Sequence, residues 1–113
     1  MRSDPDRVRD ILEAIERIER HAGRGRAAFD SDELLQVWMV RHLQIIGEAA
    51  SRLSQNARDQ HPAVPWREII GMRHILVHGY FEVDLDLVWS VVDRELTALR
   101  DAIAPMSRGS DGS

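Results

Sequence analysis

The chain has 113 residues, of which 43% are hydrophobic and 30% are charged, and its formal net charge is −4. This length fits one compact domain and excludes a cofactor-binding domain beside a separate catalytic one. Because the sequence has no Cys, disulfides, thiolate chemistry and Cys-ligated zinc are also excluded.

The sequence predicts a soluble, cytoplasmic protein with no membrane partner. Its apolar stretches are too short for a transmembrane helix, and residues 1–10 lack the apolar core of a signal peptide. All 15 basic residues are Arg. The slightly acidic balance argues against a protein that coats nucleic acid, but a local Arg patch is compatible with it.

The first predicted helix covers residues 4–22. Pro5 suits a first helical turn and Gly23 a C-terminal stop. Its apolar residues recur at steps of three and four, so one face is buried: Val8, Ile11, Ile15, Ile18 and Ala22. Residues 23–26 are expected to form a flexible loop with two exposed cations.

The second predicted helix begins at an N-cap within residues 30–32 and reaches about Ser54. It carries two apolar rows: Leu35, Trp38, Ile45 and Ala49, and beside them Met39, Leu43, Ile46, Ala50 and Leu53. So broad a surface exceeds what three other helices are expected to cover. The excess indicates a subunit interface, and hence a homodimer.

The remaining residues predict a loop over 56–65, a third helix over 66–77 and a fourth that starts at Asp84 or Asp86. The fourth helix has a regular apolar seam: Leu85, Val88, Val92, Leu96, Leu99 and Ile103. We expect one domain over residues 1–104 and a disordered tail over 105–113. The predicted fold is an all-α, antiparallel four-helix bundle.

The third helix concentrates the polar candidates. Apolar residues occupy most of its circumference, and Arg67, Gly71, His74 and His78 share the remaining narrow sector. A short helix of this kind is expected to be buried, so its polar side chains should line a cleft or an interface. In an ideal helix Arg73 lies about 140° from His78. The two then meet only if the helix end unwinds, Arg73 curls round, or they come from different subunits.

Arg73 falls among the apolar residues of this helix, and a buried guanidinium needs an anionic partner. Glu48 on the second helix is a candidate, provided that Gly47 permits a close approach of the two helices. Arg52 lies four residues after Glu48 and suggests an ordinary surface ion pair. His42, in an apolar row, is expected to be an interior histidine with its hydrogen bonds satisfied.

Three interpretations of the cluster stay open on spacing alone. His74 and His78 have the spacing of a helical metal chelate, but no carboxylate shares their sector, which disfavours a metal site. A structural interpretation makes the histidines interface groups and Arg73 an ion-pair partner. In the third, His performs acid–base chemistry on a phosphodiester while Arg stabilises charge at phosphorus.

The segment from Arg73 to Tyr80 (RHILVHGY) resembles the R-x4-H-x-Y signature of HepT-like toxins of the HEPN superfamily. Further stretches are similar to family hallmarks: IGEAA at 46–50, PWREI at 65–69, and YF at 80–81 with DLDLVW at 84–89. The resemblance spans roughly residues 4–104. It implies a HEPN-like fold and a metal-independent endoribonuclease that cleaves RNA, with tRNA as a reported substrate class.

The resemblance also implies roles for individual residues. Arg73 and His78 match the catalytic pair, His74 the polar position after the motif Arg, and Tyr80 the residue to which the partner adds AMP. Arg67 and Glu48 are secondary candidates, as phosphate-contacting or orienting groups.

The implied partners are RNA, a second copy with the motif at the dimer interface, and an MntA-like minimal nucleotidyltransferase antitoxin; no cofactor is expected. The alternative is a non-catalytic helical dimer that binds the nucleotidyltransferase and is modified by it.

Overall fold

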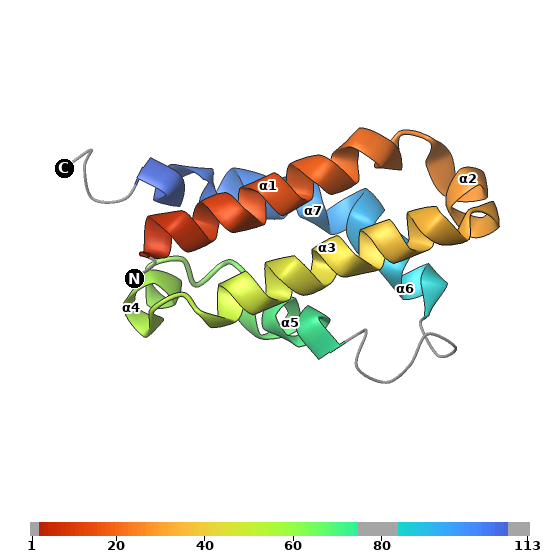
Figure 1. Cartoon of the computed structure of the whole chain (residues 1–113). Coiled ribbons are helices and arrows are strands. Elements are labelled where there is room, and N and C mark those ends of the chain that lie inside the picture. The colour runs from red at the N-terminus through yellow and green to blue at the C-terminus, as the bar shows by residue number, and fades with distance from the viewer. Residues whose placement is uncertain (1–2, 75–83, 109–113) are drawn as a thin grey trace.

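The computed structural model describes residues 3–74 and 84–108, and every regular element within these ranges is helical. Four long stretches run alternately in opposite directions along the molecule (Figure 1). They are α1 (Asp4–Ala22), α3 (Glu33–Ser51), α5 (Trp66–Gly71) with the 3-10 turn η1 (Met72–His74), and α6 (Leu85–Ser90), which continues through the π-helical turn η3 (Val91–Glu95) into α7 (Leu96–Ile103). The predicted all-α antiparallel bundle is confirmed.

A capping box starts α1. The Ser3 hydroxyl accepts a hydrogen bond from the Asp6 N–H at 3.3 Å, and the Asp6 carboxylate accepts one from the Ser3 N–H at 3.1 Å. Of the apolar residues predicted at steps of three and four, Val8, Ile11, Ile15 and Ile18 are buried and Ala22 is half-buried. The helix ends before Gly23, so the predicted boundaries of α1 are confirmed.

The central helix α3 begins where Asp32 accepts a hydrogen bond from the Leu35 N–H, and it packs against α1, α2, α5 and η1. It ends at Ser51, three residues before the predicted end. Both of its predicted apolar rows are buried or half-buried by this chain alone. The expected excess of apolar surface on these rows is therefore wrong, because α1 covers α3 together with α2, α5, η1 and α6. Among the described residues, the large apolar side chains that are exposed are Leu34 (81%), Val37 (49%) and Leu87 (53%).

Two short helices replace parts of the predicted loops. α2 (Gly25–Ser31) follows a turn at Gly25, whose φ of 89° favours glycine, and it is anchored by buried Phe29 against Trp89 at 5.3 Å between ring centroids. α4 (Gln55–Asp59) is capped by Ser54, whose hydroxyl accepts from the Ala57 N–H. The sequence predicted loops over 23–26 and 56–65. These predictions are wrong for residues 25–26 and 56–59, which are helical.

The end of the described chain also departs from expectation. Residues 104–108 form the 3-10 helix η4 (Ala104–Arg108), which packs against α1, where a disordered tail from residue 105 was expected. The Arg9 guanidinium donates a hydrogen bond to the Ser107 carbonyl oxygen at 3.1 Å. Residues 109–113 lie outside the described ranges, and the domain boundaries stay a prediction. Among the described helices, none has the length and apolar character needed to cross a membrane.

Candidate functional site

The turn that carries the motif arginine is fixed at its start and along its length. The Trp66 indole N–H donates hydrogen bonds to the carbonyl oxygens of Arg58 and His61, at 3.1 and 3.0 Å, and so holds the first residue of α5. The helix then tightens into η1, where buried Met72 anchors the turn. Since a 3-10 turn has three residues per turn, the ideal-helix angles assumed for Arg73 and His74 do not apply here.

Gly47 brings α3 into contact with the backbone of this turn. A Cβ at Gly47 would lie 2.6 Å from the Arg73 backbone nitrogen and 2.8 Å from the Ile69 carbonyl oxygen. Real Cβ atoms do not approach other atoms so closely, so only glycine fits without a shift of the backbone. The close approach that the sequence predicted at Gly47 is confirmed.

The Arg73 guanidinium lies beside Glu48. Its Nη1 is 3.8 Å from Glu48 Oε1, and its Nε donates to His74 Nε2 at 3.4 Å. The other Glu48 oxygen accepts a 3.1 Å hydrogen bond from Arg52 Nε. Both predicted pairs of Glu48 are therefore present, and the carboxylate is shared between two arginines.

The expected burial of Arg73 is wrong. Its side chain is 36% exposed and that of Glu48 is 47% exposed, so the pair is screened by water and adds little to stability. A half-exposed guanidinium that is held by a neighbouring carboxylate is accessible to an anion from solution. The geometry thus favours a role in contacting a ligand over a role in packing.

The structure separates the other predicted residues into two groups. His74 joins Arg73 and Glu48, and its side chain is exposed. Arg67 is also exposed, but it lies seven residues before His74, about 12 Å along the helix axis. His78 and Tyr80 lie outside the described residues, so their predicted roles are not located.

The remaining histidine prediction is confirmed. His42 is 7% exposed, and its Nδ1 lies 2.8 Å from the Trp38 carbonyl oxygen. Its ring packs on the Trp38 ring at 4.3 Å between centroids. Within residues 3–74 and 84–108, no three His, Asp or Glu side chains converge in a way that would hold a metal ion.

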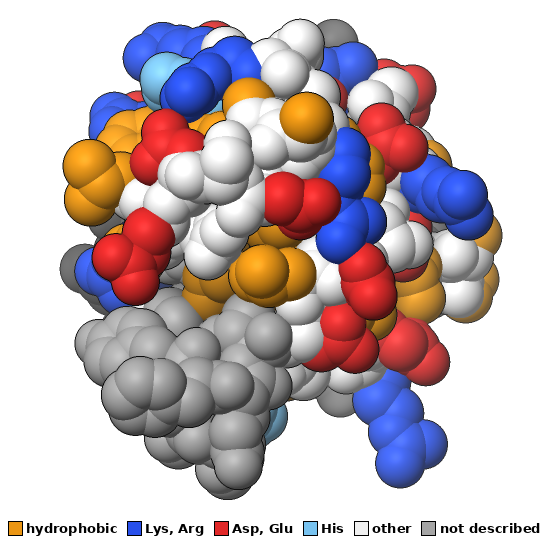
Figure 2. Space-filling view, turned by 90° about the vertical axis from the view of Figure 1, so that its right-hand side faces the viewer, with side chains coloured by type: hydrophobic (Ala, Val, Ile, Leu, Met, Phe, Trp, Pro, Cys, Tyr) orange, Lys and Arg blue, Asp and Glu red, His pale blue; other side chains and the backbone are white. Residues whose placement is uncertain are grey.

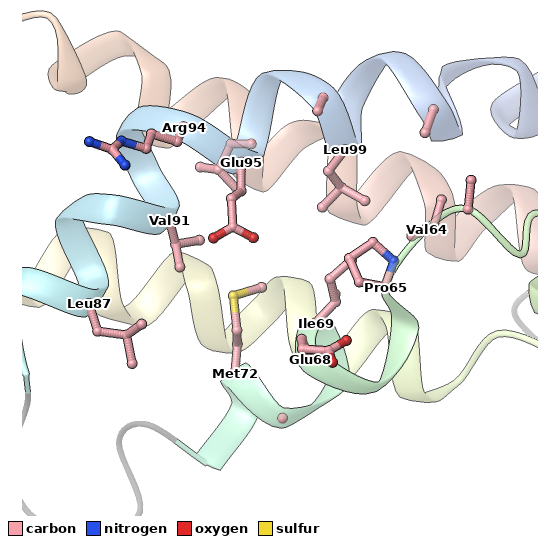
Figure 3. Close-up of a pocket in the computed structure, with 15 residues that line it drawn as sticks. Val64, Pro65, Glu68, Ile69, Met72, Leu87, Val91, Arg94, Glu95 and Leu99 are labelled. Atoms are coloured by element: carbon pink, nitrogen blue, oxygen red, sulfur yellow. The ribbon is translucent and has the colours of Figure 1, made fainter.

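A mainly apolar groove of about 580 Å³ lies on another side of the motif helix, between α5–η1 and α6–α7. Figure 3 shows Leu87, Val91 and Met72 pointing into it, with the Glu95 carboxylate between the helices and Glu68 at the lower wall. Arg73, His74 and Glu48 do not line it. Its charged groups are the carboxylates of Glu68 and Glu95 and the guanidinium of Arg94. A mainly apolar groove without an excess of positive charge suits a protein surface better than a phosphate backbone.

Sequence reasoning did not identify Arg58 as a functional candidate. It lies on α4, within the segment predicted to be a loop, and its backbone carbonyl holds Trp66 at the start of the motif helix. The signal that was available is Ser54, a favoured N-cap residue directly before this helix.

Comparisons with known proteins assign this chain to a family. The family model described as "Ribonuclease HepT-like" matches residues 11–106. A "Probable ribonuclease HepT" of Thermococcus cleftensis is 37% identical over 102 residues, which cover 88% of this chain and 91% of the relative. A "Putative RNase" of Caldanaerobacter subterraneus is 40% identical over 86 residues, 76% of this chain and 77% of the relative.

A third relative is longer. A Methanocaldococcus jannaschii protein named "Gamma-glutamylcyclotransferase and putative RNase" is 38% identical over 94 residues, which cover 82% of this chain and 42% of that protein. No solved structure matches the chain significantly.

Proposed function

Because this chain belongs to the ribonuclease HepT-like family, we propose that it is a metal-independent endoribonuclease that uses Arg73 and His78. The observation that carries the proposal is the Arg73 side chain, which is half-exposed on a 3-10 turn, beside His74 and held by Glu48. An arginine in this setting can donate two hydrogen bonds to the oxygens of a phosphodiester. The names of the relatives support the same activity.

The proposed reaction needs no metal because the substrate supplies its own nucleophile. The ribose 2′-oxygen attacks the adjacent phosphorus and loses its proton to a base, while the 5′-oxygen of the next nucleotide leaves and takes a proton from an acid. The products are a 2′,3′-cyclic phosphate and a 5′-hydroxyl. His78 transfers one of these protons, and Arg73 stabilises the negative charge that accumulates on the phosphoryl oxygens.

The secondary residues support this pair. His74 accepts a hydrogen bond from Arg73, and Glu48 accepts one contact from Arg73 and another from Arg52. These contacts restrict the guanidinium to one side of the turn. We assign to Arg67, on the same helix but away from Arg73, a contact with a neighbouring phosphate.

A homodimer forms part of the proposal. One motif histidine per chain supplies one proton-transfer group, and a second copy supplies the other. The exposed side chains of Leu34, Val37 and Leu87 and the apolar groove of Figure 3 leave surface that a second copy can bury.

The biological setting that we propose follows from the family. The chain acts as the toxin of a toxin–antitoxin pair, with tRNA as substrate and an MntA-like nucleotidyltransferase as antitoxin. Transfer of AMP to Tyr80 adds about one negative charge per phosphodiester and a bulky base next to the RNA site, so it blocks the substrate without a change of fold.

Cleavage of bulk tRNA with and without a chelator tests the activity. We expect cleavage to resist the chelator, and His78→Ala and Arg73→Ala each to lower the rate by about 100-fold or more. His74→Ala should have a smaller effect. Matched controls are His61→Ala and Arg20→Ala, which remove a histidine and an arginine outside the motif and its contacts, and circular dichroism checks that each variant is helical.

Two results would contradict the proposed ribonuclease activity or its assigned residues. Intact RNA at high protein concentration would favour the non-catalytic dimer that binds the nucleotidyltransferase. Cleavage by both motif variants at the wild-type rate would show that the assigned residues are not catalytic.

Mass spectrometry tests the modification separately. After incubation with ATP and the cognate nucleotidyltransferase, the wild type should carry AMP on Tyr80, and Tyr80→Phe should stay unmodified and active. Transfer to another residue, or none, would refute this part and leave the ribonuclease proposal standing.

A further inference from the structure

A shallow hollow of about 610 Å³ lies where α4 meets the start of α5. Two arginines and a tryptophan contribute to its lining, which includes Gln55, Arg58, Asp59, Trp66, Arg67 and Ile70. It is separate from the apolar groove of Figure 3, with which it shares no lining residue.

Trp66 presents an aromatic surface of fixed orientation to this hollow. Both hydrogen bonds of its N–H go to backbone carbonyl oxygens of the preceding segment, so the polar group of the indole is fully used. The ring is half-buried and packs against the core on one side. What it offers to a ligand is therefore an apolar π-surface, which suits stacking of a planar group.

The two arginines of the hollow have no carboxylate partner within the described part of the chain. Arg58 donates from Nη2 to the neutral Gln55 side chain at 3.3 Å, and its Nε is buried without a hydrogen-bond partner. Arg67 is exposed and makes no ion pair there. The one acid in the lining, Asp59, accepts a 2.7 Å hydrogen bond from Gln55. The hollow thus combines two available cations with one aromatic ring.

The opposite end of the molecule is different. Figure 2 shows acidic and basic side chains interspersed over the end formed by α2, α6 and the start of α3. Here Arg24 pairs with Asp32 at 3.3 Å, and Arg26 pairs with Asp30 at 2.8 Å and also with Asp86. These arginines are neutralised by the chain itself, which leaves the α4–α5 end as the better site for an anionic strand.

The hollow lies close to the motif turn along the chain. Ile70 lines it and lies four residues before His74. The distance from Arg67 to His74 is about 12 Å along the axis. Since a stacked strand rises about 3.4 Å per nucleotide, this distance corresponds to about three to four nucleotides.

We propose that this hollow binds a single-stranded stretch of RNA that flanks the cleaved phosphodiester, with a base stacked on Trp66 and phosphates contacted by Arg58 and Arg67. The inference rests on the proposed ribonuclease function and assigns the subsite that lies outside the motif. Stacking on a side chain requires an unpaired base, so the hollow selects single strands over duplexes.

Binding of a 2′-O-methylated RNA of about eight nucleotides tests the subsite, because such RNA lacks the nucleophile and stays intact. Fluorescence anisotropy against salt concentration gives the dissociation constant and its salt dependence. Arg67→Gln and Arg58→Gln should each reduce the slope of log K against log salt by about 0.7, the value for one lost phosphate contact. The matched control is Arg94→Gln, which removes an exposed arginine outside the hollow and should leave the slope unchanged.

Two substitutions of Trp66 distinguish stacking from support of the fold. Trp66→Leu should weaken binding about 5- to 100-fold with an unchanged salt slope, because a stacked base is lost but no phosphate contact. Trp66→Phe loses the same N–H hydrogen bonds but keeps an aromatic face, so it should bind much more tightly than the Leu variant. Equal weakening by Leu and Phe would mean a structural role and would overturn the proposal.

The remaining outcomes separate this inference from the proposed function. Unchanged salt slopes for Arg67→Gln and Arg58→Gln, or equal competition by duplex RNA or an acidic peptide, would overturn the subsite even if tRNA is cleaved. If tRNA stays intact but the variants behave as expected, the ribonuclease proposal fails and the single-strand site stands.

Discussion

Gly47 controls how the motif arginine is placed. Its missing side chain lets α3 touch the backbone at Arg73 and Ile69, and the next residue, Glu48, then reaches the Arg73 guanidinium. The ion pair is half-exposed and weak, so the tight backbone contact sets the position of Arg73 and the carboxylate adjusts its orientation.

We expect Gly47→Ala to lower the free energy of unfolding by about 1–3 kcal/mol, because the added Cβ must displace backbone rather than a flexible side chain. This exceeds the gain of about 0.5–1 kcal/mol that alanine normally brings to a helix. Ribonuclease activity should also fall, because Arg73 moves.

The matched control is Gly71→Ala on α5, where a Cβ meets nothing within 4 Å. It should leave stability unchanged or raise it. Urea denaturation of both variants checks the opposite signs, and equal stability of the two would refute the role assigned to Gly47.

At the scale of elements, repeated apolar spacing determines which helices can be predicted from the sequence. α1 and α3 were predicted because each buries residues at steps of three and four over five turns. α2 and α4 were missed because each has a single buried anchor, Phe29 and Ala57, and so shows no period. The contact of Arg9 with Ser107, which helps to hold η4, joins residues 98 apart, a distance that local patterns do not encode.

The same reasoning explains which parts of the site were predictable. Arg73, His74, Glu48 and Gly47 stand out as polar or small residues among apolar ones. Arg58 does not, because its place beside Trp66 depends on the missed helix α4.

The capping box of α1 predicts how stability depends on pH. The pKa of Asp6 is lowered, first by the hydrogen bond from the Ser3 backbone N–H and then by the one from Arg9. Because the pKa of Asp6 is lower in the folded state, its charged carboxylate stabilises the fold at pH values above the ordinary Asp pKa of about 3.9. This stabilisation is lost as the pH falls through the lowered pKa of the folded state.

Asp6→Asn should therefore be less stable than the wild type at neutral pH, and the difference should shrink as the pH falls below about 4. Urea midpoints measured across this range provide the check. A difference that stays constant with pH would show that the charge of Asp6 is not involved.

For the whole molecule, charge is distributed unevenly despite the net charge of −4. Arginines at the α2–α6 end are paired with aspartates, whereas Arg58 and Arg67 at the α4–α5 end have no such pair among the described residues. A small acidic protein can bind RNA in this way, because a local pair of guanidinium groups that no carboxylate neutralises acts at short range while salt screens the rest.

The proposed catalysis depends on the formation of a homodimer. We expect light scattering at micromolar concentration to give twice the 12.9 kDa chain mass, because two proton-transfer groups are needed and each chain brings one motif histidine. A stable interface buries about 1,200–2,000 Å² in total. The exposed apolar residues of α3 and α6 and the groove of Figure 3 offer surface for it.

Mixing experiments show whether the second copy takes part in the reaction. A trace of wild-type chain in excess His78→Ala chain is drawn into mixed dimers, so a site that needs both histidines loses activity in proportion to mixing. Excess of a chain with an unrelated substitution, such as Arg20→Ala on the exposed face of α1, keeps His78 and is itself active, so total activity should rise with the amount of added chain. A monomer by light scattering, or wild-type activity that survives the His78→Ala excess, would mean that each chain cleaves alone and that the second proton-transfer group lies within the same chain.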